Sequence, residues 1–419
     1  MPDAETVSSS YRLFDSPQAR DRLVAELVAQ IEPRLTAIRR ELHQRPELSN
    51  REVWTARFIL HRLQELGIAD IRANVARHGL IATIRGGRPG RTVGIRADMD
   101  ALPIDEPPGL PFASVRPGVM HACGHDVHMT VALGAAEVLA RLSRHFSGAV
   151  KFFFQPAEEG PPPGEEGGAK LMIAEGALDA PRPDAIFALH CYPPLEAGQL
   201  GYNAGVMMSS CDRFAIAVRG KMAHGAYPHR GVDAIVVAST IVMMLQTIRS
   251  RMIDAQQPMV LTIGKMQGGR RYNIVADEVL LEGTVRAFDE TARAETEALI
   301  HQIVSNVAAG GGASYDIRYE QLVPPLVNDA RLVKRMVPTL QRVFGGERVI
   351  EHAPRMGAED FACFAREAPA MFYSLGVSNR AAGVSGDIHT PQFAVDEACI
   401  ATGVRAMTAL ALDFLMSDS

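Results

Sequence analysis

The sequence predicts an α/β protein with a mostly parallel sheet, interrupted by an inserted α+β domain. Apolar strand-like runs alternate with helical patterns in the first half of the chain, which is typical of α/β domains. From about Ser210 the order becomes strand, helix, strand, strand, helix, strand, the split order of a ferredoxin-like sandwich. The alternation resumes beyond Pro324, and this last segment alone would form a thin core. We therefore expect it to complete the first domain.

The chain opens with two predicted helices. Apolar residues recur at helical spacing from about Arg22 to Leu42, with a break expected at Pro33. A second helix from Thr55 should end at Gly67. The elements expected next are strands 79–86 and 91–98, a helix from 124 to about 142, strand 149–155, a short helix 170–177 and strand 184–190.

The inserted part should hold four strands and two helices. The strands are expected at 213–220, 258–266, 279–288 and 314–320, and the helices at 231–250 and 289–308. A helix from Ala330, a strand at 370–376 and a helix from Val395 close the chain. The predicted domains are therefore residues 1–207 with 323–419, and an inserted domain of residues 208–322.

Composition excludes several classes of protein. The 419 residues are 47% hydrophobic and 22% charged, as in ordinary globular proteins. A formal net charge of -5 leaves no basic excess for a nucleic acid partner.

Residues 1–20 lack the pattern of a secretory signal, so we expect a cytoplasmic protein. The apolar run Ala234–Ile248 is too short to span a membrane and predicts a buried helix. The 5 scattered cysteines make a disulfide framework improbable.

The segment MHACGHDVH (120–128) gathers a thiol and three imidazoles. Cys123 and His125 flank a glycine before a predicted helix, so both side chains can reach one point. Thiolate and imidazole are ligands that borderline-soft divalent metals prefer. The alternative is a buried cysteine beside surface histidines. We interpret His121 and His128 as supporting groups.

Carboxylates follow two predicted strands. Glu158 and Glu159 come directly after one strand, and adjacent side chains there point to opposite sides, so one can bind metal while the other transfers protons. A glutamate pair alone is usually a solvated turn. Asp98 and Asp100 follow another strand, however, and His190 closes a third. Ligand sites of open α/β sheets lie at such carboxyl ends of parallel strands.

Two chemistries remain open at this stage. Cys123 could be a nucleophile with a histidine as its base, but the carboxylates would then have no role. A hydrolytic metal site explains more residues, because a metal lowers the pKa of bound water towards ~7 and a carboxylate can take its proton. His389 becomes a candidate ligand only if the C-terminal segment returns to the site.

The assembled motifs resemble the family of co-catalytic metal amidohydrolases, which includes hippurate hydrolase, the indole-acetyl-amino-acid hydrolases and, more distantly, aminoacylase and carboxypeptidase G. The resemblance covers nearly the whole chain after about Leu35. It rests on motifs in the family's order: RRELHQRPELS, GIRADMDALPI, MHACGHD, FQPAEEG, ALHCYP, GKMAHGAYPH, GTVRAFD, MGAEDFACF and IHTPQF.

The resemblance implies two divalent metal ions per subunit, zinc or manganese, with nickel or cobalt as alternatives. It implies that Cys123 bridges the ions and that four further side chains complete the ligand set. These are His125, Glu159, His190 and His389.

The resemblance also implies the catalytic groups. Glu158 would be the general base and Asp98 a supporting residue beside the metals. In the inserted domain, a lid and dimerisation unit, His224 would polarise the scissile carbonyl, commonly across a homodimer or higher homo-oligomer. Asn273 and Arg286 would hold the substrate's carboxylate, although a surface charge is the alternative for Arg286.

The chain departs from the family pattern in four places. These are Lys221–Gly225, Asn273–Asp277, Val127 in place of a glycine, and an insertion at Pro161–Glu166. None removes a proposed ligand or the base.

The sequence therefore predicts a metal-dependent hydrolase that cleaves the amide C–N bond of a small N-acyl or N-aroyl amino acid. The alternatives are a hydrolytic deaminase of an aromatic amine at the same site and a non-catalytic metal-containing binding protein. A mere binder would need neither Glu158 nor His224.

Overall fold

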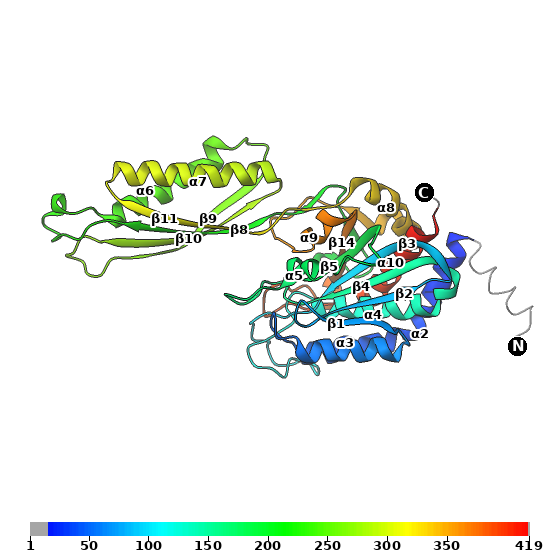
Figure 1. Cartoon of the computed structure of the whole chain (residues 1–419). Coiled ribbons are helices and arrows are strands. Elements are labelled where there is room, and N and C mark those ends of the chain that lie inside the picture. Colours follow the sequence, from blue (N-terminus) through cyan, green and yellow to red (C-terminus); the bar gives the residue numbers. More distant parts are fainter. Residues whose placement is uncertain (1–15, 418–419) are drawn as a thin grey trace, which may run out of the picture. The chain divides into compact units, whose positions relative to one another are not determined.

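The computed structural model describes residues 16–417 (Figure 1). The chain divides into two compact units, each described here by itself. The first comprises residues up to Gly205, Asn328–Ala353 and the chain from Cys363 onward. The second comprises Val206–Val327 and Pro354–Ala362.

An 8-stranded mixed sheet forms the centre of the first unit, in the order β1-β2-β4-β3-β5-β14-β6-β13. The central strands β4, β3, β5 and β14 are parallel neighbours, whereas β1 and β2 form an antiparallel edge. The predicted, mostly parallel α/β sheet is thus confirmed. The strands are β1 (Asp70–Val75), β2 (Gly79–Arg85), β3 (Arg88–Asp98), β4 (Ser147–Gln155), β5 (Ala185–Glu196), β6 (Leu200–Tyr202), β13 (Val349–Glu351) and β14 (Ala370–Ser378).

Three long helices of the first unit, α2, α4 and α10, pack against one another and bury their apolar faces in the main core. The α-helices are α2 (Pro17–Gln44), α3 (Val53–Glu65), α4 (His125–Arg141), α5 (Gly168–Ala174), α8 (Ala330–Phe344), α9 (Ala362–Glu367) and α10 (Ala398–Met416). Short 3-10 turns lie at Ser143–His145, Gly346–Arg348 and Arg380–Ala382.

The predicted break at Pro33 is wrong, because α2 continues through this residue. Pro33 faces solvent, while Ile31 and Leu35 on either side belong to an unbroken buried stripe. Burial of that stripe outweighs the single backbone hydrogen bond that proline removes.

His190 does not close its strand, as the sequence predicted. β5 continues to Glu196, because its far half pairs with β14. The pairing of β5 with β3, however, ends at Ala188 opposite Arg96. His190 therefore stands level with the end of β3, where the predicted site lies.

The second unit has a 4-stranded antiparallel sheet in the order β11-β8-β10-β9. This is the strand order of the expected ferredoxin-like sandwich. Its elements are β8 (Cys211–Arg219), α6 (Ala234–Thr247), β9 (Met259–Gly268), β10 (Glu278–Ala287), α7 (Glu290–Gly310) and β11 (Ser314–Val323). Smaller pieces are β7 (Val206–Met208), β12 (Leu326–Val327) and turns at Pro228–Arg230 and Ile248–Met252.

The helix α6 is buried on one face only, so the prediction of a buried helix holds for half of it. Val237 and Ile241 enter the core of this unit, whereas Val236 and Met243 are 61% and 70% exposed. Two segments, Ala234–Met252 and Ala398–Met416, have the length and composition of a membrane span, so the prediction that the helix starting at Ala234 is too short is wrong. This is weak support for a membrane location, because core helices of water-soluble proteins pass the same test.

Candidate metal centre

The site forms where β4, β3 and β5 lie side by side (Figure 1). Asp98 is the last residue of β3 and pairs with Gln155, the last residue of β4. Glu158 and Glu159 follow β4 after a short turn. Because the strands are parallel, their carboxyl ends bring these side chains to one edge of the sheet.

The N-terminus of α4 delivers the thiol and an imidazole to this edge. Gly124, which precedes the helix, has φ +91, and a Cβ there would lie 2.6 Å from the sulfur of Cys191. Glycine is therefore required for this turn. The turn buries both Cys123 and His125, the first residue of α4.

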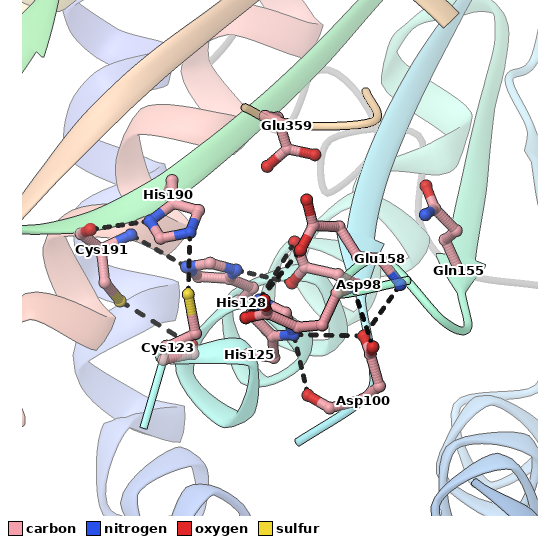
Figure 2. Close-up of polar contacts among 12 residues, drawn as sticks. Asp98, Asp100, Cys123, His125, His128, Gln155, Glu158, His190, Cys191 and Glu359 are labelled. Carbon is pink, nitrogen blue, oxygen red and sulfur yellow. Dashed lines mark hydrogen bonds and ion pairs between the residues drawn. The ribbon is translucent and has the colours of Figure 1, made fainter. Parts of the chain in front are cut away.

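Sulfur, imidazole and carboxylate groups converge at the site (Figure 2). The Cys123 Sγ lies 3.3 Å from the His190 Nε2 and 3.2 Å from the His389 Nε2. The Glu159 Oε1 lies 3.2 Å from the His389 Nε2 and 3.9 Å from the His125 Nε2. The five side chains that the sequence nominated as ligands thus lie together.

Hydrogen bonds leave the ring nitrogens in a suitable state for coordination. The His125 Nδ1 donates to the Asp100 carbonyl oxygen at 2.8 Å, and the His190 Nδ1 donates to the Cys191 carbonyl oxygen at 2.7 Å. Each Nε2 is therefore the ring atom that can act as a ligand once the imidazole is neutral, as in metal-binding histidines. Within residues 16–417, the His125 Nε2 and the Glu159 Oε1 are buried and lack hydrogen-bond partners.

His389 reaches the site from the C-terminal part of the chain. Its backbone is left-handed, with φ +60, and its N–H donates to the Ala122 carbonyl oxygen at 2.8 Å. Non-glycine residues in this conformation are strained and concentrate at functional sites. The contact with Ala122 fixes the imidazole beside Cys123.

His128 and Asp98 lie beside the site and contact each other and neighbouring groups. The His128 Nε2 accepts a hydrogen bond from the Cys191 N–H at 2.9 Å, and its Nδ1 donates to Asp98 at 2.6 Å. The other oxygen of Asp98 accepts from Arg96, also at 2.6 Å. His121 is buried and lies near His43, with ring centroids 6.5 Å apart.

The electrostatics of the site suit a bound cation. Burial and the neighbouring Glu159 and Glu158 carboxylates raise the pKa of the Cys123 thiol well above its ordinary value. Burial lowers the pKa of His125, but Asp98 and Asp100 outweigh this and raise it to about 10. A cation would reverse both trends, because it stabilises thiolate and neutral imidazole as ligands. The donor set therefore fits divalent metal ions.

Asp100 follows a predicted strand, but the sequence assigned it no role. In the structure its carboxylate fixes the backbone of both glutamates. Its carboxylate accepts hydrogen bonds from the N–H groups of Glu158 at 3.1 Å and Glu159 at 3.0 Å. Ser49 donates to the same carboxylate at 2.7 Å. The Glu158 side chain stays close to the site, with its Oε2 3.9 Å from the His125 Nε2.

The three candidates of the second unit do not all lie together. His224 is exposed and bridges Ile274, next to Asn273. Arg286 lies near the opposite end of β10, where it pairs with Val260. Eight residues separate Arg286 from Glu278, the first residue of β10, which is about 26 Å at the ~3.3 Å rise of a strand.

The comparisons with known proteins identify the family of this chain. The profile described as "Peptidase family M20/M25/M40" matches residues 94–413. An N-acyl-L-amino acid amidohydrolase of Geobacillus stearothermophilus is 39% identical over 348 residues, 82% of this chain and 92% of that protein. An N-acetyl-L-cysteine deacetylase of Bacillus subtilis is 38% identical over 370 residues, 88% of this chain and 85% of that protein.

A solved structure supports the same family. The YXEP protein of Bacillus subtilis, described as a dinuclear metal binding peptidase from the M20 family, superposes with a TM-score of 0.80. It is 32% identical and the match covers 93% of this chain and 100% of that chain. The family resemblance inferred from the motifs is thereby confirmed. The chain belongs to peptidase family M20/M25/M40.

Proposed function

We propose that this protein is a metal-dependent hydrolase that cleaves the amide C–N bond of small N-acyl or N-aroyl amino acids. The observation that carries the proposal is the convergence of one thiol, three imidazoles and a glutamate at the carboxyl edge of the sheet. The relatives named above, an amidohydrolase and a deacetylase of N-acylated amino acids, support this substrate class.

Two divalent ions would be held by Cys123, His125, Glu159, His190 and His389. When bound, such ions lower the pKa of water and polarise an amide carbonyl. We expect zinc or manganese, with nickel or cobalt as alternatives, because this mixed donor set accepts them all.

Glu158 is the proton carrier in this proposal. It accepts a proton from the attacking water and then delivers it to the departing amine. Its backbone N–H donates to Asp100, and its side chain is only 8% exposed, so its carboxylate can face the reacting atoms while largely shielded from bulk solvent. Asp98 stays in its supporting position between Arg96 and His128.

A thiol nucleophile fits the geometry less well. A catalytic cysteine needs a lowered pKa, whereas burial raises that of Cys123. The carboxylates beside the sulfur would also repel a thiolate in the absence of a cation.

The second unit supplies groups for the substrate. The His224 Nδ1 accepts a hydrogen bond from the Ala226 N–H at 3.1 Å, so the Nε2 carries the ring proton and can donate to a carbonyl oxygen. We propose that Asn273 and Arg286 bind the substrate's carboxylate. His224 bridges Ile274, which lies before the start of β10, whereas Arg286 lies near the end of that strand, so we propose that the two residues meet one substrate from two copies of the chain.

We therefore propose a homodimer or higher homo-oligomer, with the unit Val206–Val327 as its lid and dimerisation domain. The exposed apolar face of α6 supports this, since exposed apolar patches mark association surfaces. We also propose a cytoplasmic location.

Metal replacement and one substitution test the function. Chelated protein should lose hydrolysis of N-acetyl and N-benzoyl amino acids and regain it with zinc or manganese. Glu158→Gln should keep its metal ions, counted by elemental analysis, yet lose about 10²–10⁴-fold in kcat. Full activity of verified metal-free protein, or of Glu158→Gln, would overturn the proposal.

A further inference from the structure

The turn before the two glutamates is strained. Ala157, directly before Glu158, is 1% exposed and has φ +54. A residue with a Cβ avoids this left-handed conformation unless its surroundings enforce it. The turn determines where the following side chains point, so whatever enforces it also sets the direction of Glu158.

Glu52 is the group that holds this turn. One of its oxygens, Oε1, accepts the Ala157 N–H at 2.8 Å and the Asn50 N–H at 3.0 Å. The Glu52 side chain is fully buried, although a carboxyl group is costly to bury. Burial raises its pKa to about 8, and the Asp100 carboxylate adds to this, so a neutral carboxyl suffices for the two contacts.

The residues next to Glu52 hold the other end of the same loop, Glu158–Glu166, here called the glutamate loop. The Asn50 Nδ2 donates to the Glu166 carbonyl oxygen at 3.0 Å and to Glu165 at 3.1 Å. Arg51 forms an ion pair with Glu165 at 2.6 Å. A Cβ on Gly167 would lie 2.8 Å from the Asn50 Oδ1, so the chain closes tightly on Asn50.

Residues Ser49–Glu52, here called the clasp, therefore contact the glutamate loop at both its start and its end. Ser49 reaches the N–H groups of Glu158 and Glu159 through Asp100, Glu52 holds the start of the loop, and Asn50 and Arg51 hold its end. The loop includes Pro161–Glu166, the residues that the sequence motifs indicate as an insertion relative to the family pattern.

We propose that the clasp is the positioning element for the catalytic base, and that Glu52 acts by holding Ala157 in its left-handed turn so that Glu158 faces the metal site. Glu52 touches neither substrate nor metal in this arrangement, and its effect passes through the backbone. The proposal rests on the proposed function, in which Glu158 is the base.

A matched pair of substitutions isolates the hydrogen bond from the packing. Glu52→Gln keeps an oxygen acceptor of the same shape, and Glu52→Met fills similar space without one. At saturating metal, Glu52→Gln should retain kcat within about threefold. Glu52→Met should lose about 10- to 100-fold in kcat with little change in KM, since small displacements of a catalytic group cost this much.

A second substitution distinguishes positioning from general damage. Glycine adopts a positive φ freely, so Ala157→Gly in the Glu52→Met background should restore kcat about fivefold or more. A cavity or a folding defect would not respond in this way. Glu47→Gln, a buried carboxyl in the same segment that bonds Thr55 and not the loop, serves as the control and should leave kcat unchanged.

The outcomes separate the two proposals. Equal kcat for Glu52→Met and Glu52→Gln, no recovery with Ala157→Gly, or full recovery by added metal alone would overturn the clasp while leaving the proposed function intact. If Glu52→Met does not fold, Ser49→Ala, which removes a donor to Asp100, must lower kcat at constant KM or the proposal falls. Wild-type activity of Glu158→Gln would instead remove the base itself.

Discussion

Mixing two inactive variants tests whether neighbouring copies share a site. His224→Ala removes the proposed carbonyl donor and should lower kcat about 10²–10³-fold, the usual loss for one such hydrogen bond. Glu158→Gln removes the base. Neither substitution touches the proposed ligands, so both proteins should keep their metal ions.

The expected recovery follows from the geometry. If His224 is supplied by the partner, a mixed dimer has one site with an intact base and an intact histidine, and one site lacking both. Random exchange of equal amounts makes about half of the dimers mixed, so about one quarter of all sites should be active. If His224 acts within its own chain, every site lacks one group and the mixture shows only the mean of the two variants.

The assay is the initial rate of amide hydrolysis after partial denaturation and refolding of the mixture. A tagged copy of one variant allows the mixed dimers to be purified and their fraction measured. Recovery that stays at the parental mean in verified mixed dimers would refute both the shared site and the argument from the separation along β10.

Other expectations concern the metal ions and the buried charges. Cys123→Ala should lower metal occupancy, measured by elemental analysis, whereas retained occupancy would argue against a thiolate ligand. Metal removal should lower the melting temperature measured by calorimetry, because a ligand at 100 times its Kd stabilises the folded state by about 2.7 kcal/mol; an unchanged value would contradict a preformed site. Asp126→Asn should cost about 3–5 kcal/mol in denaturant unfolding, since Arg39 and His43 would lose their buried partner. Burial alone would raise the pKa of Asp126, but Arg39 and His43 hold it well below its ordinary value. Wild-type stability should therefore fall as the pH drops below about 4, and this loss should shrink in Asp126→Asn.

The part of the site that the sequence could predict is local or follows from strand order. Cys123 and His125 are two residues apart at a helix start, so their convergence needs only a glycine turn. Asp98 ends β3 and Glu158 follows β4, its parallel neighbour, and this order places them together. His389 is different, because it depends on a left-handed backbone and a contact with Ala122 that no local pattern reveals.

The secondary structure, too, could be predicted from the sequence only where local patterns decide it. Helices and strands follow from apolar periodicity, yet Pro33 lies within a helix because the buried face around it outweighs its local preference. The far half of β5 is a strand because β14 pairs with it, and β14 lies far along the chain. In both places, packing or strand pairing with distant parts of the chain outweighs the local conformational preference.

The clasp shows why residues that only support a site are not recognised from sequence motifs. A ligand is recognisable by its side-chain chemistry, since few residue types bind divalent metals. Glu52 and Asn50 are ordinary polar residues whose importance lies in which backbone N–H or carbonyl they meet, and those partners are more than a hundred residues away. One observable signal remains in the structure, which is a fully buried carboxyl bonded to a strained turn. A search for that combination, rather than for further ligand types, is therefore the more direct route to the residues that position a catalytic base.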